Sequence, residues 1–280
     1  MRLLRVGQPS REVPCVLDAS GQARDISAIV TDISPETIPD LHRLLAQAEV
    51  TSLPLVATRG SRIGPPMSQP RNIYCIGLNY SDHAAEAGLP VPAEPILFNK
   101  AACTFCGPND DILFSPKMTK LDWEVELGVV IGKVGLNIAP DKAMDHVFGY
   151  TVVNDLSERA WQMERGGQWA KGKSFPNFCP TGPWLVSRDE VPDVQNLDMS
   201  LNVNGQRRQT GTTARMIFSV AHIVAYISEF LRLEPGDLIC TGTPPGVGAG
   251  MKPPHWLNLG DVVDLQIEGL GQQRQTVVAL

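Results

Sequence analysis

The sequence lacks the features of membrane and nucleic-acid-binding proteins. Its 280 residues contain no run of 18 or more apolar residues, so we expect no membrane-spanning helix. The formal net charge is −6 at pH 7, whereas binding to nucleic-acid phosphates needs a basic face. The first residues lack the apolar core and cleavage site of a signal peptide. We therefore expect a cytoplasmic protein with no nucleic-acid or membrane partner.

Cysteine is scarce, and its six copies form no complete metal-site pattern. Cys103 and Cys106 make a C-x-x-C, but no second such pair and no nearby histidine supplies the four ligands of a structural zinc site. We expect reduced, partly buried thiols, with a redox role for this pair as the alternative. The glycine-rich segment 241–248 lacks the Gly-Lys-Ser/Thr of a mononucleotide-binding loop, so a pocket for a carboxylate fits it better.

The composition, 43% hydrophobic and 19% charged, is typical of a globular protein. Residues 1–70 predict a small α/β module ending in a linker rich in glycine and proline, and residues 71–280 predict the catalytic domain. Strand patterns outnumber helical ones, with one clear helix predicted from about 214 to 231 by apolar residues at spacings of three and four. The sequence shows no regular βαβ alternation. We expect an α+β fold, mostly β, with a mixed or antiparallel-rich sheet.

Two glutamates, Glu124 and Glu126, stand at the head of a strand pattern that continues into the apolar run Leu127–Gly132. Residues i and i+2 of a strand point to the same face, so both carboxylates project together. A solvated sheet face is the ordinary explanation of such a pair. The apolar run after it is typical of a strand covered on both faces, which favours burial. Buried like charges repel each other unless a proton or a cation intervenes, and oxygen ligands suit Mg²⁺, Ca²⁺ or Mn²⁺.

Further polar residues follow neighbouring strand patterns. Asp155 ends the predicted strand Gly149–Asp155 and is the best third metal ligand, although turn residues of this type are common. His83 and Glu86 lie on one face of a short predicted helix, where a carboxylate can orient an imidazole as a general base. An incidental pair on a surface helix is the alternative. Four more residues are candidates for binding an anionic substrate or are solvated surface: Arg159, Gln162, Arg165 and Lys173.

Together these residues resemble the fumarylacetoacetate hydrolase family over about residues 70 to 280. The resemblance is carried by the following motifs: Gly77-Leu78-Asn79-Tyr80-x-x-His83, Glu124-x-Glu126, Asn154-Asp155-x-Ser157-x-Arg159-x-x-Gln162, Gly172-Lys173-Ser174, and Pro235-Gly236-Asp237 through Thr241-Gly242-Thr243-Pro244 to Gly248. Within the family the sequence is most similar to bacterial 2,4-diketo-3-deoxy-L-fuconate and L-rhamnonate hydrolases. Phe175-Pro176-Asn177 after Ser174 departs from the usual pattern, which bears on the pocket rim and so on the substrate.

The resemblance implies a mixed β-roll core, a homodimer, and one Mg²⁺ or Mn²⁺ held by Glu124, Glu126 and Asp155. It implies that His83 and Glu86 activate water. By the same resemblance, Gln162, Lys173 and Thr243 match positions that contact the substrate or its oxyanion. We also expect substrate contacts from Arg159, Arg165, Tyr80 and Gly242.

The activity implied by the resemblance is hydrolysis of a carbon–carbon bond in a 2,4-diketo acid, with release of pyruvate and a hydroxy acid such as L-lactate. The same site chemistry permits oxaloacetate decarboxylation, keto–enol tautomerisation or hydration of 2-oxo-pentenoates, and ureidoglycolate cleavage is a weaker alternative. A non-catalytic metabolite-binding protein is the rival from another class, and the intact metal and His83–Glu86 motifs argue against it.

Overall fold

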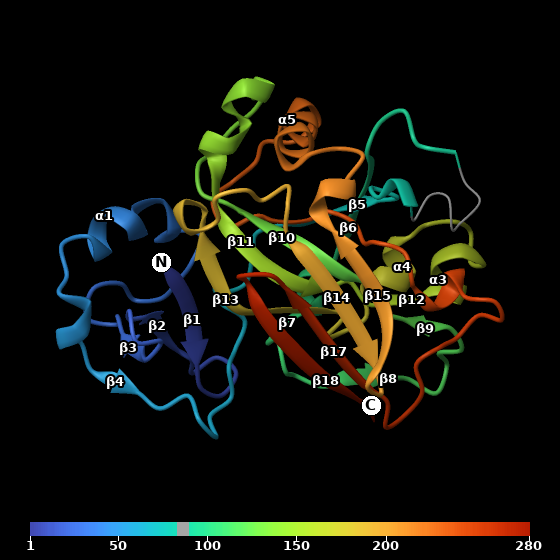
Figure 1. Ribbon diagram of the computed structural model, residues 1–280, viewed down its shortest axis with the longest axis horizontal. Helices are drawn as coiled ribbons and strands as arrows, with labels where there is room; N and C mark the ends of the chain where they lie inside the picture. Colours follow the sequence, from blue (N-terminus) through green and yellow to red (C-terminus); the bar gives the residue numbers. More distant parts are fainter. Residues whose placement is uncertain (83–89) are drawn as a thin grey trace.

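The computed structural model describes residues 1–82 and 90–280. An 11-stranded sheet runs through the molecule (Figure 1). From one edge to the other its strands are β4 (Leu55–Val56), β3 (Ala23–Asp25), β2 (Val13–Leu17), β1 (Arg2–Val6), β13 (Cys179–Ser187), β11 (Val147–Asn154), β10 (Val125–Ile131), β16 (Leu238–Cys240), β5 (Ile73–Gly77) and β6 (Ile96–Lys100), with β7 (Phe105–Cys106) paired to β13. Most neighbouring strands are antiparallel, while β16 and β5, and β7 and β13, run parallel.

A second sheet packs against the central strands of the first. Its five strands, in order, are β15 (Gln206–Thr212), β14 (Asp198–Val203), β17 (Val262–Ile267), β18 (Gly271–Ala279) and β8 (Ile112–Phe114). Apolar side chains such as Leu127 of β10 and Leu265 of β17 are fully or almost fully buried in one core between the sheets. A short pair, β12 (Ser157–Glu158) and β9 (Leu121–Asp122), lies beside them. The structure therefore confirms a fold that is mostly β with mixed sheets.

Helices are short. The α-helices that lie wholly within the described residues are α1 (Leu41–Leu45), α3 (Arg159–Met163), α4 (Ala170–Lys173) and α5 (Val220–Phe230). The 3₁₀ helices are η1 (Ile38–Asp40), η2 (Val50–Ser52), η3 (Ala102–Thr104), η4 (Pro140–His146), η5 (Arg188–Glu190), η6 (Thr213–Arg215) and η7 (Gly248–Gly250). In the part of the chain that the structure describes, no helix has the length and apolarity needed to cross a bilayer.

The predicted start of the long helix at about residue 214 is wrong. The helix α5 begins at Val220, because Ser219 is extended and its hydroxyl accepts a hydrogen bond from the N–H of His222. This is a typical N-cap, and Ala214 and Arg215 belong to η6 instead. The apolar spacing continued across the cap and concealed it.

The predicted module 1–70 and the rest of the chain share one sheet. Strand β1 pairs antiparallel with β13, with Leu3 opposite Leu185. A single apolar cluster also contains Leu3 and Cys240. Figure 1 shows the first strands, in blue, beside this edge of the central sheet. A boundary at residue 70 remains a prediction about the domains, while strand pairing crosses it.

Strands β10 and β11 set the geometry of the site. Both are buried along their whole length and rich in β-branched residues, as expected for central strands. Their antiparallel register places Glu126 opposite Val153 and Val125 opposite Asn154. Asp155 follows directly, and its N–H donates to the carbonyl of Glu124 over 2.9 Å. The register therefore brings an acidic residue of one strand end beside two of the other.

Candidate metal centre

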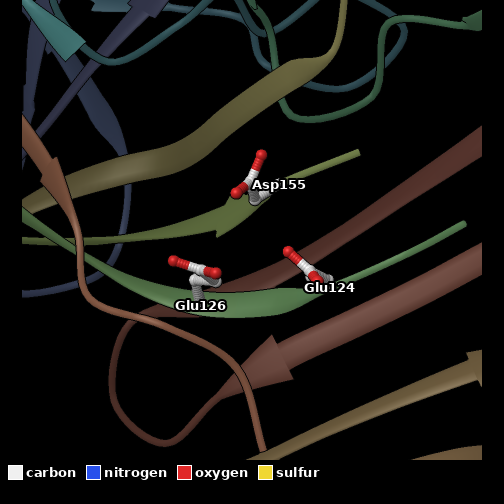
Figure 2. A group of neighbouring side chains, drawn as sticks. All are labelled: Glu124, Glu126 and Asp155. Atoms are coloured by element: carbon white, nitrogen blue, oxygen red, sulfur yellow. The ribbon is translucent and has the colours of Figure 1, made fainter. Parts of the chain in front are cut away.

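Three buried carboxylates converge at this strand end. Glu124, Glu126 and Asp155 each offer an oxygen, and these oxygens lie within 4.8 Å of one another. Their exposed fractions are 6%, 2% and 0%. Figure 2 shows the three side chains pointing toward one another, with Glu126 on β10, Glu124 just before β10 and Asp155 just after β11. The predicted burial and convergence of these residues match the structure.

Three cationic side chains surround the cluster. Lys173 Nζ lies 2.6 Å from Glu124 Oε2 and 2.7 Å from Asp155 Oδ2. Lys100 Nζ lies 2.5 Å from the other oxygen of Asp155. Arg159 Nη2 lies 2.6 Å from Glu124 Oε1. Glu124 and Asp155 are thus each held by two cations.

Glu126 is different. Its Oε2 accepts a hydrogen bond of 2.8 Å from the N–H of Gly242, and no lysine or arginine among the described residues forms an ion pair with it. Burial, and then the charges of Asp155 and Glu124, raise the pKa of Glu126 well above its usual range. Burial also acts on Glu124, but Arg159 and Lys173 outweigh it and lower the pKa of Glu124 to about 2.

This donor set fits a hard divalent cation. Carboxylate oxygens are the ligands that Mg²⁺, Mn²⁺ and Ca²⁺ prefer. A buried carboxylate without a cationic partner is costly, and a metal ion beside Glu126 supplies the missing positive charge. The three carboxylates would hold the ion. The physical reason to expect an ion there is that the charge of Glu126 is not neutralised by the described lysine and arginine side chains.

The sequence did not single out two residues of this centre. Lys100, at the end of β6, is 4% exposed, and Asp122, on β9, is fully buried. Asp122 Oδ2 lies 2.8 Å from Arg159 Nε, and its carboxylate also accepts the N–H groups of Gly248 and Ala249 at 2.6 and 3.0 Å. Asp122 therefore orients Arg159 toward Glu124. The sequence offered two signals for these residues. Lys100 ends an apolar strand pattern, and Asp122 is an acid two residues before Glu124.

The glycine-rich loop after β16 lies against the glutamates. Gly242 has φ +96°, and a Cβ there would lie 2.8 Å from the Cβ of Asn79, so a side chain is doubly disfavoured. Thr243 donates through its hydroxyl to the carbonyl of Val125 over 2.9 Å. The loop thus directs a backbone N–H at Glu126 and fixes the strand that carries it.

A cavity of 70 Å³ opens beside the carboxylates. Its described lining comprises Ile76, Gly77, Leu78, Phe98, Glu124, Glu126, Arg159, Gln162, Trp169, Lys173 and Thr243. Gln162 accepts a hydrogen bond from Arg159 Nη1 at 3.1 Å, and Lys173 Nζ lies 5.2 Å from the ring centre of Phe98. The structure therefore brings Gln162, Lys173, Arg159 and Thr243 to one cavity.

Two predicted substrate contacts lie elsewhere. Tyr80 is fully buried in the apolar core, with its hydroxyl 3.1 Å from Met199 Sδ, and Arg165 is exposed on the segment between α3 and α4. Neither belongs to the described lining of the cavity.

His83 and Glu86 lie outside the described residues. All six cysteines are free, with Cys103 exposed and Cys106 buried.

Comparison with known proteins places this site in a family. Residues 72–278 match the family model described as fumarylacetoacetate (FAA) hydrolase C-terminal. The chain is 54% identical over 278 residues to a Burkholderia multivorans protein whose name goes no further than hydrolase, covering 98% of each.

Solved structures agree over the full length. A fumarylacetoacetate hydrolase from Exiguobacterium antarcticum is 36% identical with a TM-score of 0.87, covering 100% of both chains. A 2-hydroxyhepta-2,4-diene-1,7-dioate isomerase from Mycobacterium marinum is 30% identical with a TM-score of 0.79, covering 100% of this chain and 98% of the other.

A maleylpyruvate hydrolase from Sphingobium sp. SYK-6, in complex with manganese(II) and pyruvate, is 27% identical with a TM-score of 0.83. The alignment covers 100% of this chain and 99% of that one. The family model covers well over half of the sequence, and the carboxylate cluster lies within the matched residues. The chain therefore belongs to the fumarylacetoacetate hydrolase family.

Proposed function

We propose that this protein hydrolyses a carbon–carbon bond in a 2,4-diketo acid with the help of one divalent cation, Mg²⁺ or Mn²⁺. The observation that carries the proposal is the buried cluster of Glu124, Glu126 and Asp155, in which Glu126 has no cationic partner among the residues that the structure describes. The similar maleylpyruvate hydrolase in complex with manganese(II) and pyruvate supports a cation that binds next to an α-oxo acid.

When bound, the cation supplies Lewis-acid polarisation and stabilises developing negative charge. His83, oriented by Glu86, would take a proton from the attacking water, a role that rests on the sequence resemblance. The water oxygen bonds to C4 of the substrate, the C3–C4 bond breaks, and its electron pair remains on C3, which then takes a proton. The products are pyruvate and the carboxylate derived from C4.

Lys173 and Gln162 are the donors available for the oxyanion that forms at C4. Both side chains are almost fully buried and line the cavity. The hydrogen bond from Arg159 to Gln162 Oε1 leaves the amide NH₂ of Gln162 as its donor group. Fixed donors in a site with little water stabilise such an oxyanion strongly.

The finer proposal is that the diketo acid derives from L-rhamnonate or L-fuconate, with L-lactate as the second product. It rests on Ser157-Glu158-Arg159, on the segment 164–169 and on Gly182 through Val186. A homodimer is proposed on the same resemblance.

A second candidate is chemistry through the enolate of a 2-oxo acid without hydrolytic cleavage, as in a tautomerase, a 2-oxo-pentenoate hydratase or, with loss of CO₂, an oxaloacetate decarboxylase. The similarity to the M. marinum isomerase favours it. In that case His83 would move a proton and deliver no water to a carbonyl.

One experiment separates these functions. The protein is incubated with Mg²⁺ or Mn²⁺ and a panel of 2,4-diketo acids, including those derived from L-rhamnonate and L-fuconate, and with oxaloacetate. Stoichiometric pyruvate and a carboxylic co-product from a diketo acid support hydrolysis. Isomerised substrate, or CO₂ from oxaloacetate with no cleavage of any diketo acid, would replace the proposal by the second candidate.

A further inference from the structure

We propose that this site selects 2-oxo acids with a single negative charge and discriminates against dicarboxylates. The preference rests on the proposed function, and it narrows the substrate to acids whose far end is neutral. Two observations carry it: the charge balance of the buried cluster, and the apolar wall of the remaining cavity.

The cluster contains four buried carboxylates and three cations. The carboxylates are Asp122, Glu124, Glu126 and Asp155, and the cations are Lys100, Arg159 and Lys173. With all of them ionised, one negative charge is in excess. A divalent cation turns this excess into one positive charge, which a single substrate carboxylate neutralises. A second carboxylate would leave a negative charge in a site with little water, where it is costly.

Each cation of the cluster already neutralises one or two of its carboxylates. Lys100 pairs with Asp155, Arg159 bridges Asp122 and Glu124, and Lys173 bridges Glu124 and Asp155. These ion pairs are at 2.5–2.8 Å, so moving a cation toward a distal carboxylate would expose a buried acid instead.

Apart from Gln162 and Thr243, the rest of the described cavity wall is apolar. Phe98 and Trp169 pack edge to face with ring centres 5.1 Å apart, and Ile76 and Leu78 continue the wall. Trp169 lies against Gly77 so closely that a Cβ there would lie 2.6 Å from its ring. Such a surface accepts an alkyl or hydroxyalkyl group and offers a carboxylate no partner.

Two cations close in sequence to Lys173 do not line the cavity. Arg165 and Lys171, on the segment before Lys173, are exposed and outside the described lining, and Lys171 Nζ donates to the carbonyl of Arg165 over 2.6 Å. We therefore expect this protein to disfavour a dicarboxylate such as the dioate in the name of the M. marinum isomerase.

Binding of two matched ligands tests the proposal without turnover. 2-Oxovalerate and 2-oxoglutarate share a five-carbon chain and a 2-oxo acid group, and neither has the second ketone that cleavage requires. Isothermal titration of the Mn²⁺-loaded protein should give a Kd for 2-oxoglutarate at least about tenfold higher than for 2-oxovalerate, because its second carboxylate is left unpaired.

A charge placed in the wall should reverse this preference. In Trp169→Arg, the Kd for 2-oxoglutarate divided by the Kd for 2-oxovalerate should fall by about tenfold or more, because the guanidinium pairs with the second carboxylate. The neutral control Trp169→Gln should leave this ratio unchanged. A ratio equally changed in both variants would overturn the assignment of the wall.

The wild-type protein alone decides the main point, whether or not the variants fold. Equal or tighter binding of 2-oxoglutarate would overturn the selectivity and leave the proposed function standing. Binding of neither acid in the presence of Mn²⁺ would overturn the proposed function itself.

Discussion

Two groups of largely buried ionic side chains in this molecule differ in how completely they are paired. In the first, near the N-terminus, Arg5 contacts Asp32 and Glu12, and Arg62 contacts Glu12 and Asp110, at 2.5 to 3.3 Å. Every carboxylate of this group has a guanidinium partner. The hydrogen bonds to Asp110 are the main reason that the pKa of Arg62 is raised.

In the second group, at the start of β10, Glu124 and Asp155 are paired, whereas Glu126 forms no ion pair within residues 1–82 and 90–280. The difference separates two uses of buried charge. The paired group joins β1, the segment before β5 and the segment after β7, and it needs nothing further. The group with an unpaired carboxylate is complete only with a cation.

The largest expected effect comes from removing the unpaired carboxylate. Glu126→Gln should abolish binding of Mn²⁺ and all metal-dependent turnover, because a ligand and its charge are lost. The metal-free variant should remain folded, since an amide replaces a charge that burial disfavours. Calorimetric titration with Mn²⁺ and thermal unfolding in chelator measure the two properties. Unchanged metal affinity would remove Glu126 from the centre.

Lys173 tests whether a paired cation of the site also serves the reaction. Lys173→Ala should lower kcat by about 10²–10³ if it stabilises the oxyanion. The exposed neighbour gives the matched control, since Lys171→Ala should leave kcat unchanged. Steady-state kinetics at saturating Mg²⁺ measure both. A kcat equal to that of the wild type would exclude Lys173 from the mechanism.

The paired group should respond in the opposite way to Glu126. Glu12→Gln leaves Arg5 and Arg62 each with one partner fewer in a buried place, so the free energy of unfolding should fall by about 1–3 kcal/mol. Affinity for Mn²⁺ should not change. Urea unfolding and metal titration give the two values. The control is Asp40→Asn, which removes an exposed ion pair with Arg43 and should change the free energy of unfolding little. Weakened metal binding in Glu12→Gln would erase the distinction between the groups.

The smallest effect is on pH dependence in the metal-free protein. The folded state holds a proton on Glu126 to a higher pH than the unfolded chain, where glutamate has a pKa of about 4.3. The unfolding free energy should therefore fall as pH rises from about 4.3 toward the raised pKa. Glu124 has the opposite effect. Its lowered pKa stabilises the folded state above about pH 4.3, and this stabilisation is lost as the pH falls toward about 2.

The difference between wild type and Glu126→Gln isolates this contribution. Urea unfolding in chelator between pH 4 and 8 should show the wild type losing stability relative to the variant as pH rises. Parallel curves would mean that Glu126 ionises in the folded protein as easily as in the unfolded one.

The metal ligands were accessible to sequence reasoning because their geometry is local. Glu124 and Glu126 share a face through the two-residue period of a strand, and the apolar residues after them indicated burial. Asp155 was found through its position at the end of another strand. The residues that compensate these charges were less accessible: Lys100 and Asp122 lie in segments whose proximity depends on the pairing of distant strands.

Tyr80 was predicted to contact the substrate, but its position also depends on a residue distant in sequence. It stands in a motif beside the predicted site, yet its ring enters the apolar core and its hydroxyl meets Met199, which is 119 residues away in sequence. The start of α5 was misplaced for a local reason, since Ser219 interrupts the helix without interrupting the apolar spacing.

The order of residues along the chain was enough to determine a mostly β protein with an acidic strand end, because strand periodicity and apolar content act over a few neighbours. Only the tertiary structure decided which charges meet. It paired Glu124 and Asp155 with cations from three separate segments and left Glu126 with one backbone N–H. The physical reason is that the energy of a buried charge depends on every group within a few ångströms, and folding alone brings those groups together.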